Sequence, residues 1–547
     1  MRALQTLTRI APTGLLRPRA ALRRWDLLRR GDLPRRWDLL RPLALAIAVG
    51  LAGCSHVPLY QRPAAPVAER FPGATDDAAN PAPEPAAELP WRTYFTDQRL
   101  VSLIDLGLAN NRDLRVAVLA IERARALYQI QRADQLPSLT GSAQHTRQRI
   151  SAATTPAGVS FLAGYYQVGL ASTAYELDFF GRVRALSQAA LASYLATEEA
   201  RRTTHIGLVA SIANAWLSLQ ADEDLLRLSR ETLASREASV KLARVRFEGG
   251  VAPETDLQQA LTLLEAARAI VAQLTRSRAL DENALALLIG GPLPAGLMQD
   301  ISLVRQPALA DLPPGLPSDL LIQRPDIRGA EQSLLSANAS IGAARAGFFP
   351  RVALTGTFGL ASGELSGLFS SGSQAWSFIP SVSLPIFDGG RNQANLESSQ
   401  AGREIAVAQY EKAIQVAFRE VADALTSRAA LRDQLIALQA QVRAEEARVR
   451  LAELRYRGGV TPFMEVLDAQ RSLFAVQQSV IQIQLAQRQN QVGLYKALGG
   501  GWKDGAGGTP TAAGQASHAP LSAAQPPPPP PPAAAAAAVT SASAPSR

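Results

Sequence analysis

The spacing of apolar residues along this chain alternates between two periods, and the alternation occurs twice. Residues 97–135 contain no proline and carry apolar residues at helical spacing, which predicts a helix with a possible break at Asn110-Asn111. After Pro137, and again after Pro350, the period changes from 3.6 to 2. Each change is followed by a long helical stretch, so we expect a mainly α-helical chain with a small β part.

Four stretches with period 2 predict β-strands, at residues 139–147, 165–177, 352–360 and 376–384. Strands of this length, with one apolar face and one face of small and polar residues, resemble those of transmembrane β-barrels. A soluble antiparallel sheet would show the same alternation. Four strands are too few to close a barrel, so a membrane location requires an oligomer, and a trimer would supply twelve strands.

Two proline-free stretches, residues 183–248 and 391–457, are rich in strongly helix-forming residues. At 1.5 Å per residue each predicts a helix about 100 Å long, and the returning arms at 254–289 and 463–498 would reach only about 54 Å. The helices that end near Gln135 and Gly347 could stack on the returning arms, which gives four helical staves per chain. An ordinary coiled coil is the alternative explanation of this periodicity.

The second half of the chain is a diverged copy of the first. At a constant offset of 209, residues 242–291 match residues 451–500, and at an offset of 213 the earlier helices match as well, with Pro137 falling on Pro350. Such duplication indicates a duplicated architecture. We therefore assign residues 91–290 to a first repeat, 291–318 to a proline-rich linker and 319–502 to a second repeat.

Each copy contains a helical hairpin whose turn has the same sequence signature. A glycine pair able to take positive φ ends the long helix, a valine follows, and a proline two residues later begins the next helix. The turns consist of Gly249, Gly250 and Val251 in the first copy and Gly458, Gly459 and Val460 in the second.

The net charge of +9 on 547 residues does not indicate nucleic-acid binding. Residues 1–53 carry a charge of +8, so the basic character belongs to a segment that reads as a removable signal peptide, with an apolar core at 42–53 too short to span a bilayer. Leu51-Ala52-Gly53-Cys54 looks like a bacterial lipobox, in which Cys54, the only cysteine, would be acylated. A stray cysteine behind an ordinary signal peptide is the alternative.

Two further segments have compositions that do not favour a packed core. Residues 54–90 are rich in proline and alanine and suit an extended linker between the lipid anchor and the folded body. Residues 503–547, with runs of prolines and alanines, are low in complexity and are predicted to be disordered.

The sequence contains no catalytic or metal-binding constellation. The four histidines are far apart, and there is no nucleotide-binding loop and no nucleophile elbow. We therefore expect neither an enzyme nor a bound cofactor or metal, apart from the covalent lipid on Cys54.

Several motifs are similar to those of one known family. The chain resembles the TolC-like outer membrane factors, specifically the lipoprotein branch that works with resistance-nodulation-division efflux pumps, from Cys54 to Trp502. The motifs that carry the resemblance are CSHVPLYQRP (54–63), ANNRDLR (109–115), QRPDIR (323–328), PIFDGGRNQA (385–394), RYRGGVTPFMEVLDAQRSLF (455–474) and LYKALGGGW (494–502).

The resemblance implies a homotrimer in the outer membrane, with a twelve-stranded β-barrel and a helical tunnel in the periplasm. It implies a periplasmic adaptor protein and an inner membrane pump as partners, and passive transport of drugs or other small toxic compounds. On this basis the six turn residues are predicted to dock the adaptor, although the glycines could serve only as helix caps. Charged residues near the second turn are candidates for a gate, although most such charges are merely solvated: Arg455, Arg457, Glu465 and Asp468.

Two alternatives to efflux stay open at this point. The first is the outer membrane component of a type I secretion system, which exports polypeptides. The second is a lipid-anchored periplasmic coiled-coil scaffold that transports nothing.

Overall fold

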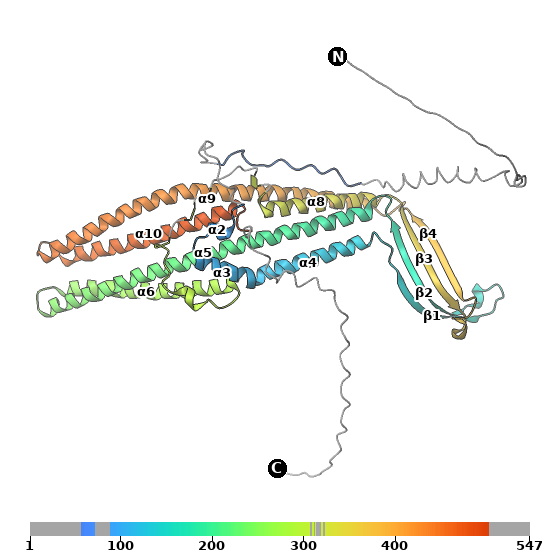
Figure 1. Ribbon diagram of the computed structural model, residues 1–547, viewed down its shortest axis with the longest axis horizontal. Helices are drawn as coiled ribbons and strands as arrows, with labels where there is room; N and C mark the ends of the chain where they lie inside the picture. Colours follow the sequence, from blue (N-terminus) through green and yellow to red (C-terminus); the bar gives the residue numbers. More distant parts are fainter. Residues whose placement is uncertain are drawn as a thin grey trace, which may run out of the picture. The chain divides into compact units, whose positions relative to one another are not determined.

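The computed structural model describes residues 56–71, 88–306, 309–310, 312, 319–320 and 323–502 (Figure 1). The predicted signal peptide, Cys54 and the C-terminal tail therefore lie outside the described residues. Chain contacts divide the protein into two compact units. Of the described residues, the first contains 56–64, 121–196 and 330–410, and the second contains 65–71, 88–120, those described between 197 and 329, and 411–502.

The described residues are mostly helical, and one sheet accompanies the helices, so the expected mainly α-helical fold with a small β part is confirmed. The longer helices are α3 (Gln98–Asn110), α4 (Arg112–Ala133), α5 (Arg182–Glu248), α6 (Glu254–Ile289), α8 (Pro325–Ala346), α9 (Arg391–Arg457) and α10 (Phe463–Ala497). The short ones are α2 (Trp91–Tyr94) and the 3-10 turns at Ala152–Thr154, Ala295–Met298 and Leu365–Gly367. Among the described helices, none is long and apolar enough to cross a bilayer.

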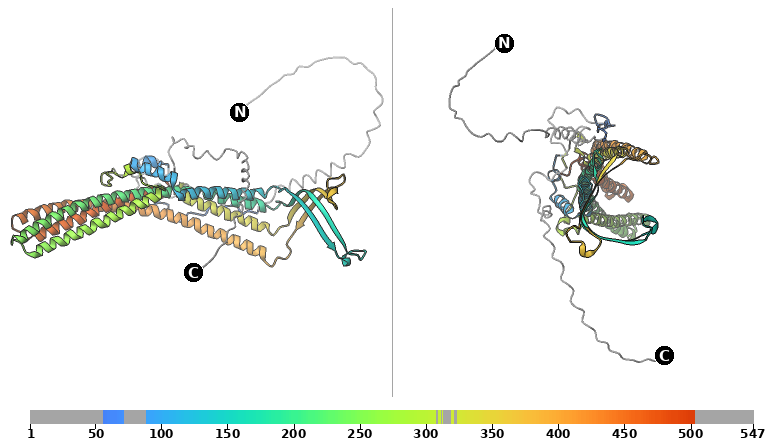
Figure 2. Two further views of the ribbon diagram at one scale, coloured as in Figure 1. Left: turned by 90° about the horizontal axis from the view of Figure 1, so that it is seen from below. Right: turned by 90° about the vertical axis from the view of Figure 1, so that its right-hand side faces the viewer.

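The sheet of the first unit has four antiparallel strands in the order of the chain. They are β1 (Thr140–Ile150), β2 (Phe161–Leu177), β3 (Arg351–Ser362) and β4 (Gln374–Ser383), each at the position that the period-2 pattern predicts. The sheet is curved (Figure 2). A bulge between Ser172 and Tyr175 contributes to this curvature, with Ala174 at φ 51°. Strands β1 and β4 are the two edges.

The two faces of the sheet differ in polarity as the sequence pattern predicts. Leu170, Phe358 and Trp376 lie opposite one another on successive strands and are all exposed, Trp376 at 74%. On the other face Thr357 and Ser377 are opposite each other, with their hydroxyl oxygens 2.6 Å apart. Soluble monomers rarely expose an apolar face of this kind, which is typical of a surface that lipid or another protein covers.

The long helices α5 and α9 each contain 67 residues and begin in the same way. The carboxylate of Asp178 accepts hydrogen bonds from the backbone N–H groups of Val183 and Arg184, and Asp388 accepts from those of Gly390 and Asn392. These bonds satisfy donors that have no partner within the helix, and the negative charges favour the positive end of the helix dipole. Both long helices of the duplicated sequence therefore begin with an aspartate that caps the first turn.

The break predicted at Asn110-Asn111 separates α3 from α4. Asn111 caps α4, because its side-chain oxygen accepts the N–H of Leu114 at 2.9 Å. Its amide nitrogen also donates to the carbonyl of Leu288 at 2.9 Å, which ties the break to the end of α6.

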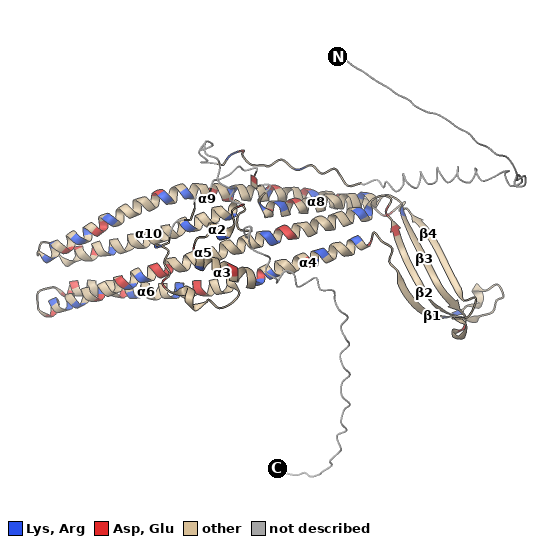
Figure 3. Cartoon of the chain, viewed as in Figure 1, with Lys and Arg blue, Asp and Glu red and all other residues tan. Residues whose placement is uncertain are grey.

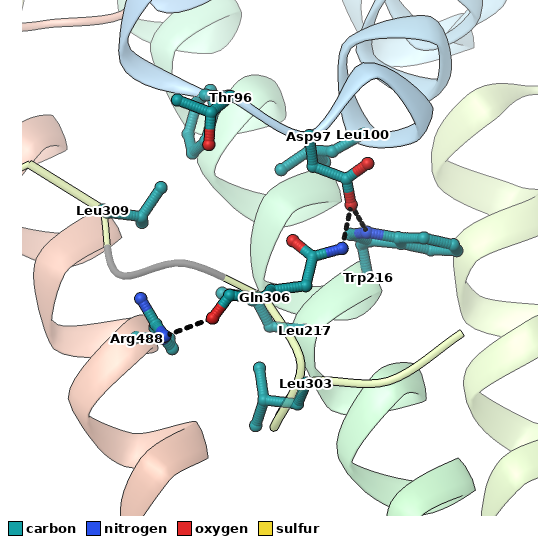
Figure 4. A pocket seen from close by; sticks show the side chains of 10 residues that line it. Thr96, Asp97, Leu100, Trp216, Leu217, Leu303, Gln306, Leu309 and Arg488 are labelled. Carbon is teal, nitrogen blue, oxygen red and sulfur yellow. Dashed lines mark hydrogen bonds between the residues drawn. The ribbon is translucent and has the colours of Figure 1, made fainter. Parts of the chain in front are cut away.

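The core of the second unit contains large aromatic side chains and a small polar cluster. The rings of Tyr94 and Tyr495 stack at 4.2 Å. Asp97 caps α3 and also accepts hydrogen bonds from the indole N–H of Trp216 and the amide of Gln306, both at 2.8 Å (Figure 4). These contacts border a cavity of about 20 Å³, room for about one water molecule. Asp97 therefore fixes the segment that follows the first repeat against α5.

Candidate functional site

The first candidate turn joins α5 to α6. Gly250 has φ 70°, and the N–H of Val251 donates to the carbonyl of Arg246 at 2.9 Å, as in a Schellman motif. Pro253 then precedes the first residue of α6. The turn leaves Val251 67% exposed, so a largely uncovered apolar side chain lies at the end of this hairpin.

The second turn, between α9 and α10, repeats this geometry. Gly459 has φ 72°, the N–H of Val460 donates to the carbonyl of Arg455 at 2.9 Å, and Val460 is 70% exposed. In both turns only the second glycine takes positive φ, while the first stays in a helical hydrogen bond. A Cβ on Gly250 or Gly459 would meet nothing within 4 Å, so backbone conformation and not space requires glycine there.

The two hairpins lie side by side (Figures 1 and 2). They share a hydrophobic cluster close to the turns. The ring of Tyr456 packs against that of Phe463 at 4.9 Å. The cluster fixes the two hairpin ends relative to each other. Its buried members are Val240, Ala243, Leu257, Ala260, Leu264, Ala452, Phe463, Val466, Leu467 and Ala469.

The four gate candidates lie near the second turn, where charges of both signs are interspersed (Figure 3). The Arg455 guanidinium is 3.6 Å from the Glu465 carboxylate, so this pair bridges α9 and α10. Asp468 is 2.5 Å from both Arg448 and Arg471, and the hydrogen bond from Arg448 lowers the pKa of its carboxyl. These pairs are substantially exposed and lie within the second hairpin.

Of the four gate candidates only Arg455 and Glu465 pair with each other, and Arg457 lies apart from them. It pairs with Glu453 one helical turn earlier, at 3.9 Å, and both residues belong to α9. The four residues were predicted as a group because they are close in sequence. The structure brings only Arg455 and Glu465 together.

A connection between the hairpins was not predicted from the sequence. The guanidinium of Arg246, in the first hairpin, donates a hydrogen bond to the Tyr456 hydroxyl in the second and lies over the same ring, 5.0 Å from its centre. Arg236 donates to Gln470 at 2.6 Å, again from one hairpin to the other. The repeat offset places Arg246 on Arg455, the residue before Tyr456, but only the packing of the helices shows which side chains meet.

The N-terminal segment 56–62 packs against α8 in the first unit. Val57 lies on Gly342, where a Cβ would be 2.4 Å from a methyl group of Val57, and Asn338 donates to the carbonyl of Pro58 at 2.8 Å. Glu331 accepts hydrogen bonds from Arg62 and Tyr60, and burial together with this bond raises the pKa of Tyr60 to about 12. The segment is therefore held in place only a few residues after Cys54.

Comparison with known proteins identifies the family. The sequence model of the outer membrane efflux protein family matches residues 103–291 and again residues 316–500, more than half of the chain. The chain belongs to the outer membrane efflux protein family. The two matched ranges overlap most of the two predicted repeats, although the exact repeat boundaries stay a prediction.

Other members of the efflux protein family match over most of their length. The solvent efflux pump outer membrane protein SrpC of Pseudomonas putida is 47% identical over 458 residues, which cover 83% of this chain and 96% of SrpC. The outer membrane protein OprJ of Pseudomonas aeruginosa is 46% identical over 462 residues, 84% of this chain and 96% of OprJ.

Solved structures agree with this assignment. The open state of the MtrE outer membrane channel of Neisseria gonorrhoeae is similar with a TM-score of 0.75 and 40% identity, covering 82% of this chain and 99% of MtrE. A membrane protein from Pseudomonas aeruginosa has a TM-score of 0.78 and 46% identity, with coverages of 83% and 99%. This efflux protein is thus an outer membrane channel, as the sequence motifs indicated, and its family consists of channel proteins.

Proposed function

We propose that three copies of this efflux protein form one passive conduit across the outer membrane. The conduit would receive drugs or other small toxic compounds from a periplasmic adaptor and an inner membrane pump of the resistance-nodulation-division class. The sheet carries this proposal. It has four strands, an exposed apolar face, and two edges, β1 and β4, without a partner strand among the described residues.

In a bilayer, open sheet edges are too costly because no water can satisfy their backbone groups. Pairing β4 of each copy with β1 of the next would leave no edge and give a closed barrel of twelve strands. The long helices, which start directly after β2 and β4, would then form the wall of the periplasmic tunnel.

Imaging of the purified particle tests this proposal together with conductance in planar bilayers. We expect a threefold cylinder and single-channel currents. A monomeric particle without conductance would contradict the proposal.

The two hairpin turns would dock the adaptor. The adaptor would contact Gly249, Gly250 and Val251 in one turn and Gly458, Gly459 and Val460 in the other. The exposed valines support this role, because each is the apolar end of a hairpin held rigid by the shared cluster. Changing both Val251 and Val460 to Asp should abolish drug resistance while trimers persist, since charge opposes burial in an interface.

Changing the same two valines to Ile is the matched control, because it keeps the surface apolar. Resistance in that control should equal that of the native protein. Full resistance in the Asp variant would remove the docking proposal.

The charged residues near the second turn would keep the periplasmic end closed at rest by pairing with those of neighbouring copies. Exposed pairs contribute only about 0.2–1 kcal/mol each, so a ring of them repeated three times could open without a large barrier. Replacing Arg455 or Asp468 by an uncharged residue should raise the conductance of the trimer in planar bilayers. If single and paired substitutions of Arg455, Arg457, Glu465 and Asp468 all leave the conductance unchanged, the gate lies elsewhere.

Cys54 would carry the lipid anchor. The packing of residues 56–62 on α8 supports this. The rings of His56 and Phe349 are 4.5 Å apart, so the residue two positions after Cys54 lies beside the start of β3. Mass spectrometry of the purified protein should find acyl groups on Cys54. A Cys54→Ala variant should lose them and still insert in the outer membrane, whereas a scaffold without a pore would become water-soluble.

Efflux of small molecules is favoured over polypeptide export by the names of the relatives, which refer to solvents, toluene and antibiotics. Cells that lack the protein should become more sensitive to such compounds, and secretion of polypeptides should not change.

A further inference from the structure

The apolar face of the sheet ends in two arginines. Directly opposite residues of an antiparallel pair point to the same face. Arg147 and Arg149 of β1 are opposite Gly164 and Leu162 of β2. On β2, Leu162 and Gly164 alternate in phase with Leu170, which belongs to the exposed apolar face described above. The two guanidinium groups therefore extend from the face that the proposed barrel turns toward lipid.

An aromatic pair lies on this face between the two arginines and the larger apolar area around Leu170. His145 and Tyr166 are opposite each other, one step before Arg147, and their rings stack at 4.1 Å. Aromatic side chains of membrane barrels gather at the boundary between hydrocarbon and headgroups. Beyond this pair, toward the loop at residues 151–160, Arg147 and Arg149 would reach the depth of the headgroups in the proposed barrel. This loop end is opposite to the end where the long helices begin, so it faces the cell exterior in the proposed arrangement.

Nothing on this hairpin neutralises the two arginines. Residues 138–175 contain no Asp or Glu, and the next carboxylate along the chain, Glu176, is at the opposite end of β2, paired with Arg182 and Arg351. Glu364 lies at the loop end of the neighbouring hairpin, where the contact recorded for its carboxylate is with the Ser366 hydroxyl. Within the described residues, the contact recorded for the Arg149 side chain is a hydrogen bond to the Ser160 hydroxyl at 3.3 Å, and neither arginine forms an ion pair. Both side chains are exposed. The surface therefore has donors in place for an anion that arrives from outside the chain.

The second repeat has no such charges on its outward face. Counting from Pro137 and Pro350, Arg147 corresponds to Leu360 and Arg149 to Ser362. The fold of the hairpin thus forms without arginine at these places. The charges of the first hairpin call for an explanation other than folding.

We propose that Arg147 and Arg149 form a binding site for the phosphate groups of lipid A, the phosphorylated glycolipid of the outer leaflet. Arginine binds phosphate through paired N–H donors, and the apolar face below it would take the acyl chains. A trimer would carry three such sites around its barrel. The site rests on the proposed trimer and on its orientation in the membrane.

The test measures binding of lipid A to the delipidated full-length protein by native mass spectrometry and thermal denaturation. A basic residue near a headgroup contributes roughly a fivefold gain in binding. The double variant Arg147→Leu/Arg149→Ser, which places the residues of the second repeat in the first, should therefore bind about thirtyfold more weakly. Arg432→Leu, an exposed arginine on α9, is the matched control and should bind like the native protein.

Two ligand controls complete the test. Dephosphorylated lipid A should bind the native protein as weakly as lipid A binds the double variant. Inorganic phosphate should not raise the melting temperature. Equal binding by the native protein and the double variant, equal binding of the dephosphorylated lipid, or stabilisation by inorganic phosphate as strong as by lipid A would each overturn the site.

Conductance in bilayers of phosphatidylcholine separates this inference from the proposed function. Native and double-variant channels should both conduct there, without any lipid A. Absence of current from the native protein would contradict the channel proposal itself. Current together with lipid A binding that ignores the arginines would contradict only the site.

Discussion

At the scale of single residues, the two glycines of each hairpin turn differ in backbone conformation, although they look equivalent in the sequence. Gly250 and Gly459 take positive φ, a conformation that costs a residue with a Cβ about 1–2 kcal/mol. Gly249 and Gly458 continue the helical hydrogen bonding, and φ is not positive in either.

This difference predicts opposite effects for neighbouring substitutions. Gly459→Ala should destabilise the turn by about 1 kcal/mol because alanine resists positive φ. Gly458→Ala, its matched control, should be neutral or slightly stabilising because alanine favours the helix. Thermal denaturation of both variants measures the difference, and equal melting temperatures would contradict this account of the turn.

Asp222, on α5, makes stability depend on pH. Burial, with a smaller contribution from Asp281 on α6, raises the pKa of its carboxyl to about 6 from an ordinary value of 3.8. Between these values the folded protein binds more protons than the unfolded chain, so stability falls as pH rises from about 4 to 6 and stays lower above.

Asp222→Asn should therefore raise the melting temperature at pH 7.5 and change it little at pH 4. After allowance for the partial exposure of the side chain, the gain in the free energy of unfolding is roughly 1 kcal/mol. In a protein that keeps Asp222, Asp281→Asn should shift the midpoint of the pH dependence of stability to lower pH, because it removes the negative charge beside Asp222. A gain from Asp222→Asn that is the same at both pH values would exclude this explanation.

At the scale of elements, the sheet depends on a close approach between β2 and β3. Gly169 and Gly359 are opposite each other, and a Cβ on Gly359 would be 2.2 Å from the carbonyl oxygen of Val168. Gly359→Val should therefore separate the strands and cost roughly 1–3 kcal/mol. Gly356→Ala, where the nearest atom is 3.8 Å away, is the control. The yield of folded protein in the outer membrane measures both, and normal yield of Gly359→Val would be unexpected.

Local pattern predicted most elements and few of their contacts. The period of the apolar residues, proline positions and the repeat offset gave the strands, the long helices, the break at Asn111 and both turns, because each depends on nearby residues. The bond from Arg246 to Tyr456 and the capture of Gln306 by Asp97 join residues about 210 apart, so they depend on how helices pack. The gate was predicted by proximity in sequence, and Arg457 faces Glu453 instead of the other candidates.

At the scale of the whole molecule, residues 56–62 connect the predicted anchor to the folded body. Glu331→Gln should weaken the charged contact with Arg62 and loosen this segment, because the bidentate pair between the half-exposed Arg62 and the mostly buried Glu331 helps to hold it to α8. Limited proteolysis should cut the variant several times faster near Arg62 than the native protein. Glu397→Gln, on α9, is a control of the same chemistry and should leave the cleavage rate unchanged.

The two edges of the sheet are different strands, so in the proposed ring each copy offers one neighbour β4 and the other neighbour β1. A copy in which one edge strand cannot pair would still join a neighbour through its other edge strand, and the barrel would not close. In a cell that makes faulty and normal copies in equal amounts, only about one ring in eight would be free of a faulty subunit. Such an allele would be dominant-negative, because its product would inactivate rings that also contain normal subunits.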